Sequence, residues 1–280
     1  MAFGIPRSAG EPLLSYGNYL QVEQLQALQK LRSDPAQHDE LLFIIIHQVY
    51  ELWFKQLLHE LDAIIERLDR DEVLGAQRLV HRCIEIERVL VAQVKVLETM
   101  TPNDFLTFRD LLMPASGFQS AQFRAVEFMC GVKNERHLEH YESGSPERAI
   151  LGQRLAGPTV GERLYALLRR RGFSLLDSDD AAGSAGADAA RERRVRELVR
   201  IYQRPDEHYD LFLLAEALIE FDEMFSLWRL HHVAMVERMI GSKPGTGGSE
   251  GVAYLRTTLE RKFFPELWEL RSYLSVKSAR

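Results

Sequence analysis

The chain has 280 residues, 46% hydrophobic and 27% charged, as in a globular protein with a sizeable core. The 35 Lys and Arg residues against 41 Asp and Glu give a net charge of −6, which argues against a nucleic-acid-binding protein. Two cysteines are too few for a disulfide framework, and the longest unbroken run of aliphatic or aromatic residues, 41–46, is too short for a membrane span. Since residues 1–12 lack the apolar stretch of a secretory signal, we expect a cytoplasmic protein without membrane partners.

Helical spacing of apolar residues dominates the sequence, and no convincing strand or internal repeat is visible. The expected helices cover residues 18–32, 36–70, 72–100, 103–112 (capped by Asn103), 120–131, 135–142, 146–171, from 191 onward, 205–240, and two short closing segments. Residues 177–190 are rich in Ala, Gly and Asp, which predicts a flexible surface loop. The chain is therefore expected to be one all-α domain over residues 1–280.

Two of the expected helices have about 30 residues and would each span about 45 Å. That length exceeds what a compact globule of this size needs. Either these helices form the axis of an elongated bundle, or they continue into contacts with other subunits. Homo-oligomerisation is a reasonable expectation.

The nine histidines are the first candidate metal ligands in this acidic, cysteine-poor sequence. A di-iron carboxylate bundle needs Glu-x-x-His on two helices, but no histidine here has a glutamate three positions earlier. The zinc motif His-Glu-x-x-His is also absent. The sequence therefore argues against both of these metal centres.

Two histidines lie on apolar helix faces. His47 shares its expected face with Phe43, and His232 shares its face with several bulky apolar side chains of helix 205–240. Such histidines are usually core residues whose ring bonds a backbone carbonyl. Haem is the alternative, because it needs an axial imidazole and a hydrophobic slot. The residues alone leave both interpretations open.

A glycine-rich loop and an arginine are candidate anion-binding elements. The loop at residues 245–249 matches neither common phosphate-binding pattern, but its amides and the Thr246 hydroxyl could hold a carboxylate, or the loop could serve as a lid. Arg109 is expected beside Phe105 and Leu112, where its partner would be a structural carboxylate or that of a ligand.

Six segments in this order closely resemble the tryptophan 2,3-dioxygenase family: SYGNYL (15–20), HDELLFIIIHQVYELWFKQLLHEL (38–61), FRDLLMPASGFQS (108–120), LWRLHHV (227–233), GTGGSEGV (245–252) and FFPELW (263–268). The resemblance runs from about residue 15 to 270 and is poor over 142–205. It implies an elongated all-α bundle enclosing haem b, active as Fe(II), in a homotetramer built as a dimer of dimers. The implied reaction inserts both atoms of O₂ across the indole C2–C3 bond of L-tryptophan, giving N-formyl-L-kynurenine in the first step of the kynurenine pathway.

The resemblance also implies roles for residues of the cofactor and indole site. His232, the second histidine of LWRLHHV, would be the axial ligand of the haem iron. His47 would be the distal histidine that accepts a hydrogen bond from the indole N–H, and Phe43 would pack on the indole ring. Ser116 of PASG would lie over the haem.

Further residues are implied to hold the amino-acid end of the substrate. Arg109 and Thr246 would bind its carboxylate and ammonium groups. Tyr16, Tyr19 and Leu20 match residues that complete the pocket of a neighbouring subunit, so residues 1–20 are expected to act there.

The sequence departs from the family pattern at Phe105, where some members have Tyr, and His231 beside His232 is a second possible ligand. Two alternative functions remain at this point. One is a related haem enzyme acting on a substituted indole, and the other is a haem-binding or oxygen-sensing protein without catalysis. Because the residues implied for substrate binding are present, the sequence favours the dioxygenase.

Overall fold

The computed structural model describes residues 13–175, 184–248 and 250–275, and within them it has helices but no strand. This confirms the predicted all-α class. The elements, with η for 3₁₀-helices, are α1 (Tyr16–Leu20), α2 (Val22–Gln26), α3 (His38–Asp69), α4 (Val73–Leu97), α5 (Pro102–Phe108), η1 (Arg109–Leu112), η2 (Gly117–Gln119), α6 (Ala121–Met129), η3 (Glu135–His140), α7 (Pro146–Ala156), α8 (Val160–Arg170), α9 (Ser184–Gln203), α10 (Tyr209–Ile240), α11 (Val252–Arg256), α12 (Pro265–Glu269) and η5 (Leu270–Tyr273).

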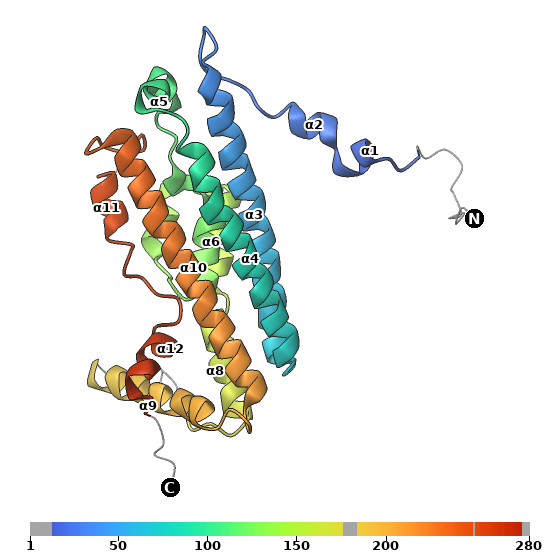
Figure 1. Cartoon of the computed structure of the whole chain (residues 1–280), viewed down its shortest axis with the longest axis vertical. Helices are drawn as coiled ribbons and strands as arrows, with labels where there is room; N and C mark the ends of the chain where they lie inside the picture. The colour runs from blue at the N-terminus through green and yellow to red at the C-terminus, as the bar shows by residue number, and fades with distance from the viewer. Residues whose placement is uncertain (1–12, 176–183, 249, 276–280) are drawn as a thin grey trace.

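The three longest helices, α3, α4 and α10, lie side by side along the long axis of the molecule (Figure 1). Each buries residues at spacings of three and four, as an amphipathic helix does, for example Leu57, Leu61, Ile64 and Leu68 on α3. The shorter α6 and α8 pack on α3, while α9 and α12 pack together at one end of the bundle. The helices α5 and α11 lie at the other end.

Buried side chains form a large core along the bundle and a smaller cluster near α5. The smaller cluster joins α3, α4, α5 and α10 through Ile46, Val94, Phe108 and Met235. Between this cluster and α6, the facing walls of α3 and α10 enclose the cavity described below. The long helices thus bring side chains that are almost 200 residues apart in the sequence to the same cavity.

A buried carboxylate fixes the C-terminal segment to α10. Oδ2 of Asp222 accepts hydrogen bonds from the backbone N–H groups of Phe263 and Phe264, at 3.0 and 3.1 Å, and from the indole N–H of Trp268 at 2.9 Å. Asp222 is fully buried, so these bonds replace those it would make to water. They hold the chain that follows the 245–251 loop.

The N-terminal segment differs from the single helix expected over residues 18–32. Gln21 takes a left-handed conformation (φ 52°) that separates α1 from α2, and the chain leaves the helix after Gln26. None of the residues of α1 and α2 is buried, and this arm extends away from the bundle (Figure 1). Without a packing surface in the same chain, its leucines do not stabilise a longer helix.

Three other expectations need correction. The helix expected from Asn103 begins at Pro102 and is capped by Thr101, because proline suits the first helical position. The segment 146–171 is two helices, since Gly157 and Pro158 interrupt it. Residues 184–190 of the expected loop 177–190 are helical in α9, as their alanine content favours, and residues 177–183 lie outside the described part, as do residues 1–12.

Helix α3 is the one described helix that is long and apolar enough to cross a membrane by length and composition alone. Only 17% of its most apolar window is buried within the chain. Its exposed apolar residues include Leu41, Ile45 and Leu52, which fall on a common stretch of the helix surface. A core helix of a soluble protein passes the same criterion, so the finding is weak evidence for a membrane span.

Candidate active site

A cavity of about 290 Å³ lies between α3 and α10. Six residues singled out from the sequence line it together: Phe43, His47, Arg109, Ser116, His232 and Thr246. They come from α3, η1, the cap of η2, α10 and the 245–251 loop. The fold therefore brings these predicted residues into one place.

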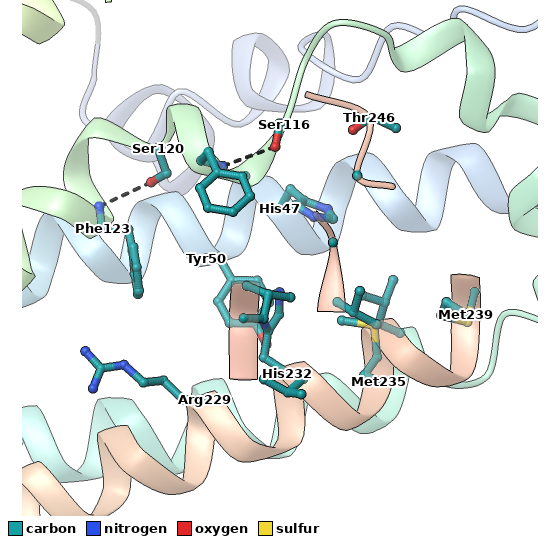
Figure 2. A pocket seen from close by; sticks show the side chains of 18 of the residues that line it. His47, Tyr50, Ser116, Ser120, Phe123, Arg229, His232, Met235, Met239 and Thr246 are labelled. Atoms are coloured by element: carbon teal, nitrogen blue, oxygen red, sulfur yellow. Dashed lines mark hydrogen bonds between the residues drawn. The ribbon is translucent and has the colours of Figure 1, made fainter. Parts of the chain in front are cut away.

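His47 and His232 project from opposite walls of the cavity (Figure 2). Nδ1 of His47 lies 2.7 Å from the carbonyl oxygen of Phe43, one turn earlier on α3. Since a carbonyl only accepts hydrogen bonds, Nδ1 carries the hydrogen and Nε2 of the neutral ring is an acceptor. Burial lowers the pKa of His47, although the bond to Phe43 and the nearby Glu51 carboxylate oppose this. The side chain is thus a neutral acceptor facing the cavity.

His232 stacks on Trp228, one turn earlier on α10. Their ring centroids are 5.2 Å apart and the ring planes differ by 10°. Burial lowers the pKa of His232 to about 4, and His47 across the cavity adds to the decrease. Among the described residues no hydrogen-bond partner of this imidazole is present, so its nitrogen lone pair is available to a ligand.

Arg109 and Thr246 connect two loops at the mouth of the cavity. Arg109, whose side chain is 12% exposed, donates a hydrogen bond to the carbonyl oxygen of Pro244 at 2.5 Å. The Thr246 hydroxyl donates to the carbonyl oxygen of Ala115 at 2.7 Å. Beside them, a side chain on Gly247 would meet Cβ of Ser116 at 2.5 Å, so only glycine permits this close approach.

Phe43 belongs to an aromatic group on the wall of the cavity. Its ring centroid lies 4.1 Å from that of His47 and 5.6 Å from that of Phe105. Phe105 itself lines the cavity, so the hydroxyl that a tyrosine would bring to this position is missing from the wall. The wall beside His47 is consequently flat and apolar, which suits a planar aromatic ligand.

The predicted residues Tyr16, Tyr19 and Leu20 do not line this cavity. They lie on the N-terminal arm, with exposed fractions of 79%, 72% and 44%. The structure is that of a single chain, so the role of these residues in a neighbouring subunit stays a prediction.

A buried ionic group at the other end of the cavity was not predicted. Glu127 on α6 accepts hydrogen bonds from Arg124 at 2.6 Å and from Arg229 of α10 at 2.9 Å. All three side chains are buried and line the cavity, giving this end one excess positive charge. The spacing of Arg124 and Glu127 signals a pair on one helix, but nothing in the sequence signals that α10 supplies the second arginine.

Comparison with known proteins places the chain in context. The family model described as tryptophan 2,3-dioxygenase matches residues 6–159 and 188–274, which is most of the chain. The chain belongs to the tryptophan 2,3-dioxygenase family. A relative named tryptophan 2,3-dioxygenase from Nocardioides sp. is 50% identical over 266 residues, covering 93% of this chain and 95% of the relative.

Other relatives with the same name come from Anaeromyxobacter sp. and Xanthomonas campestris pv. campestris. The first is 45% identical, covering 95% of this chain and 98% of the relative, and the second is 41% identical, covering 95% and 89%. All six cavity residues predicted from the sequence lie within the ranges that the tryptophan 2,3-dioxygenase model matches. The exposed N-terminal arm, α1 and α2, also lies within the matched ranges, whereas residues 160–187 fall outside them.

Proposed function

We propose that this chain is a haem-dependent dioxygenase that cleaves the indole C2–C3 bond of L-tryptophan to give N-formyl-L-kynurenine. The observation that carries the proposal is the cavity itself. It combines a neutral imidazole without a protein partner, a second neutral imidazole opposite, and an arginine at the mouth. Family membership gives the reaction its chemical class.

The residues around His232 suit haem b. Haem needs one imidazole ligand and an apolar slot, and the cavity wall beside His232 is formed by Val233, Met235, Val236 and Met239. His232 is neutral and has no competing partner among the described residues. His232 would hold the iron, and Ser116 would contact the macrocycle. When bound in the Fe(II) state, haem would supply the centre that binds and activates O₂.

His47 and Phe43 would orient the indole. Nε2 of His47 can accept a hydrogen bond from the indole N–H, because Nδ1 already donates to the Phe43 carbonyl. The Phe43 ring would pack on the indole face. A role for His47 as a general base is not needed, since an indole N–H is a very weak acid. His47 therefore fixes the position of the C2–C3 bond.

Arg109 and Thr246 would hold the amino-acid end of L-tryptophan. Their present acceptors are the backbone carbonyl oxygens of Pro244 and Ala115. A substrate carboxylate would replace the Pro244 carbonyl on Arg109, since a bidentate ionic pair is stronger than a neutral hydrogen bond. With the substrate held, the 245–251 loop would close the mouth and exclude water.

The reaction is balanced without an external reductant. The indole C2–C3 bond breaks, and each of the two carbons gains one oxygen atom from O₂ as a carbonyl oxygen. No net electrons are consumed.

The functional assembly would be a homotetramer formed as a dimer of dimers. Two exposed apolar surfaces support this, namely the N-terminal arm and the residues Leu41, Ile45 and Leu52 of α3. We assign both surfaces to contacts with further copies of this chain, with Tyr16, Tyr19 and Leu20 completing a neighbour's cavity. Deleting residues 1–20 should then lower activity without emptying the haem site, whereas an unaffected truncation would refute the shared cavity.

Labelled oxygen tests the reaction directly. The purified, reduced protein is given L-tryptophan under ¹⁸O₂, and the product is analysed by mass spectrometry. We expect N-formylkynurenine with two ¹⁸O atoms. One labelled atom would indicate a monooxygenase, and no product despite bound haem would favour the substituted-indole or oxygen-sensor alternative.

A further inference from the structure

Glu87 of α4 is a buried carboxyl group that the proposed reaction does not use. Its side chain has no exposed surface, and neither Oε1 nor Oε2 has a hydrogen-bond partner among the described residues. Burial of a polar group without a partner destabilises the folded state, so such a group in a folded protein needs an explanation.

Two further polar groups converge on the space around Glu87 from the neighbouring helices. The Tyr50 hydroxyl of α3 donates at 2.9 Å to the carbonyl oxygen of Leu90, one turn along α4 from Glu87. The indole N–H of Trp228 on α10 is buried and lacks a partner at hydrogen-bonding distance. Burial raises the pKa of Tyr50 to about 12, Glu87 adds to this rise, and Trp228 opposes it. The Glu87 carboxyl group and the Trp228 indole therefore both lie close to the Tyr50 hydroxyl. The centroids of the Tyr50 and Trp228 rings are 6.2 Å apart.

Trp228 connects this group to the cavity, because it lines the cavity and its ring also stacks on that of His232, with the two centroids 5.2 Å apart. A ring stacked nearly parallel to an imidazole restricts the imidazole's rotation. Whatever fixes the Trp228 indole therefore also fixes His232.

We propose that Glu87 is a positioning residue for the haem ligand: its carboxyl group holds the Trp228 indole N–H through one internal water molecule shared with the Tyr50 hydroxyl. Three polar partners are the usual number for a buried water. The network would fix the Trp228 ring and, through it, the orientation of His232. The proposal rests on the proposed function, because it takes His232 as the haem ligand.

The electrostatic surroundings favour a neutral Glu87 near pH 7. Burial raises the pKa of Glu87 to about 8, against the opposing effect of Arg229. Arg229 is largely committed to Glu127, with which it forms an ion pair at 2.9 Å. The titratable and charged groups that interact electrostatically with Glu87 are Tyr50 of α3, Cys83 of α4, Cys130 at the C-terminal end of α6, and Arg229 of α10. Behind them, Glu127 of α6 pairs with Arg229, and Asp222 of α10 interacts with Cys130 and Arg229.

The test is the iron–histidine stretching frequency of the ferrous, haem-loaded protein, measured by resonance Raman spectroscopy from pH 6 to pH 9. In the wild type, ionisation of Glu87 should shift this frequency with a midpoint at about pH 8. Glu87→Gln, which mimics the neutral acid, should keep the low-pH frequency throughout. Trp228→Phe keeps an aromatic ring but lacks the N–H, so it should also lose the pH dependence. This variant tests the proposal independently if Glu87→Gln does not fold.

The matched control is Glu60→Gln, which alters another buried glutamate with its own partner, Arg82, at 2.9 Å. This variant should keep the wild-type pH dependence. A haem-loaded, active wild type whose frequency does not change with pH, or a Trp228→Phe variant that retains the change, would overturn this proposal alone. A wild type that binds no haem would overturn the proposed function as well.

Discussion

Arg109 donates a 2.5 Å hydrogen bond to the carbonyl oxygen of Pro244, which ties η1 to the loop over the cavity. The side chain proposed to bind the substrate carboxylate is therefore the one that holds the loop in place. An incoming carboxylate competes with a neutral carbonyl for a charged donor, and the ionic pair is favoured. Under the proposed function, substrate binding would exchange the Pro244 contact for an ion pair, so this guanidinium group would couple the position of the loop to the bound substrate.

Replacing Arg109 should weaken substrate binding. Arg109→Ala should raise KM for L-tryptophan by about 10- to 100-fold, as expected for the loss of a charged hydrogen-bonding partner. Arg109→Lys should fall between this variant and the wild type, because lysine keeps the charge but lacks the planar fork. Haem content, measured by absorption, should not change. A KM equal to that of the wild type would assign the carboxylate to another residue.

The state of His47 predicts a pH profile. Its pKa lies below the ordinary value of 6.5, so Nε2 remains an acceptor at neutral pH and is lost only when the ring is protonated in more acidic solution. The kcat/KM for L-tryptophan should therefore stay level from pH 7.5 to 6.5 and fall below that range. His47→Ala should have a lower kcat/KM and lack this acid limb. A wild-type midpoint above 6.5 would contradict a neutral His47.

The two adjacent histidines of α10 should behave differently. His232→Ala should abolish haem retention, because it removes the proposed axial imidazole from the cavity wall. His231→Ala is the control and should retain the cofactor, since His231 is not among the described residues lining the cavity. Haem per chain after gel filtration measures both effects. A loaded, five-coordinate ferrous His232→Ala protein would exclude the proposed ligand.

Asp222 should matter for stability. Asp222→Ala leaves three N–H donors, two of them buried, without their acceptor, which should lower the free energy of unfolding by about 3–5 kcal/mol. Asp222→Asn keeps an acceptor oxygen and should lose about half as much. Urea denaturation measures both, and Glu220→Gln, at an exposed site on the same helix, should change little. Equal stability of Asp222→Ala and the wild type would show that this anchor is dispensable.

The long helices could be predicted because their apolar residues recur at helical spacing over 25 to 32 residues. The same pattern placed Phe43, His47 and His232 on apolar faces, although their meeting across one cavity depends on how α3 and α10 each pack on α4. Arg109 and Thr246 lie on short irregular segments, where residue spacing carries little information. Their assignment to one site came from resemblance to a family.

Other features could not be predicted because they depend on partners far apart in the sequence or outside the chain. The break at Gln21 reflects an arm without a packing surface of its own, which no local pattern reveals. Arg229 joins Glu127 across 102 residues. Glu87 follows the helical spacing of apolar residues on α4, so its burial as a polar group is visible only in the packed bundle.

One cavity is proposed to hold haem against His232 and L-tryptophan against His47 and Arg109. The most direct test is the absorption spectrum of the purified ferrous protein, followed by product formation after L-tryptophan and air are added. We predict a haem spectrum with about one haem per chain and the appearance of N-formylkynurenine. A protein that stays colourless after expression with added haemin would contradict the claim.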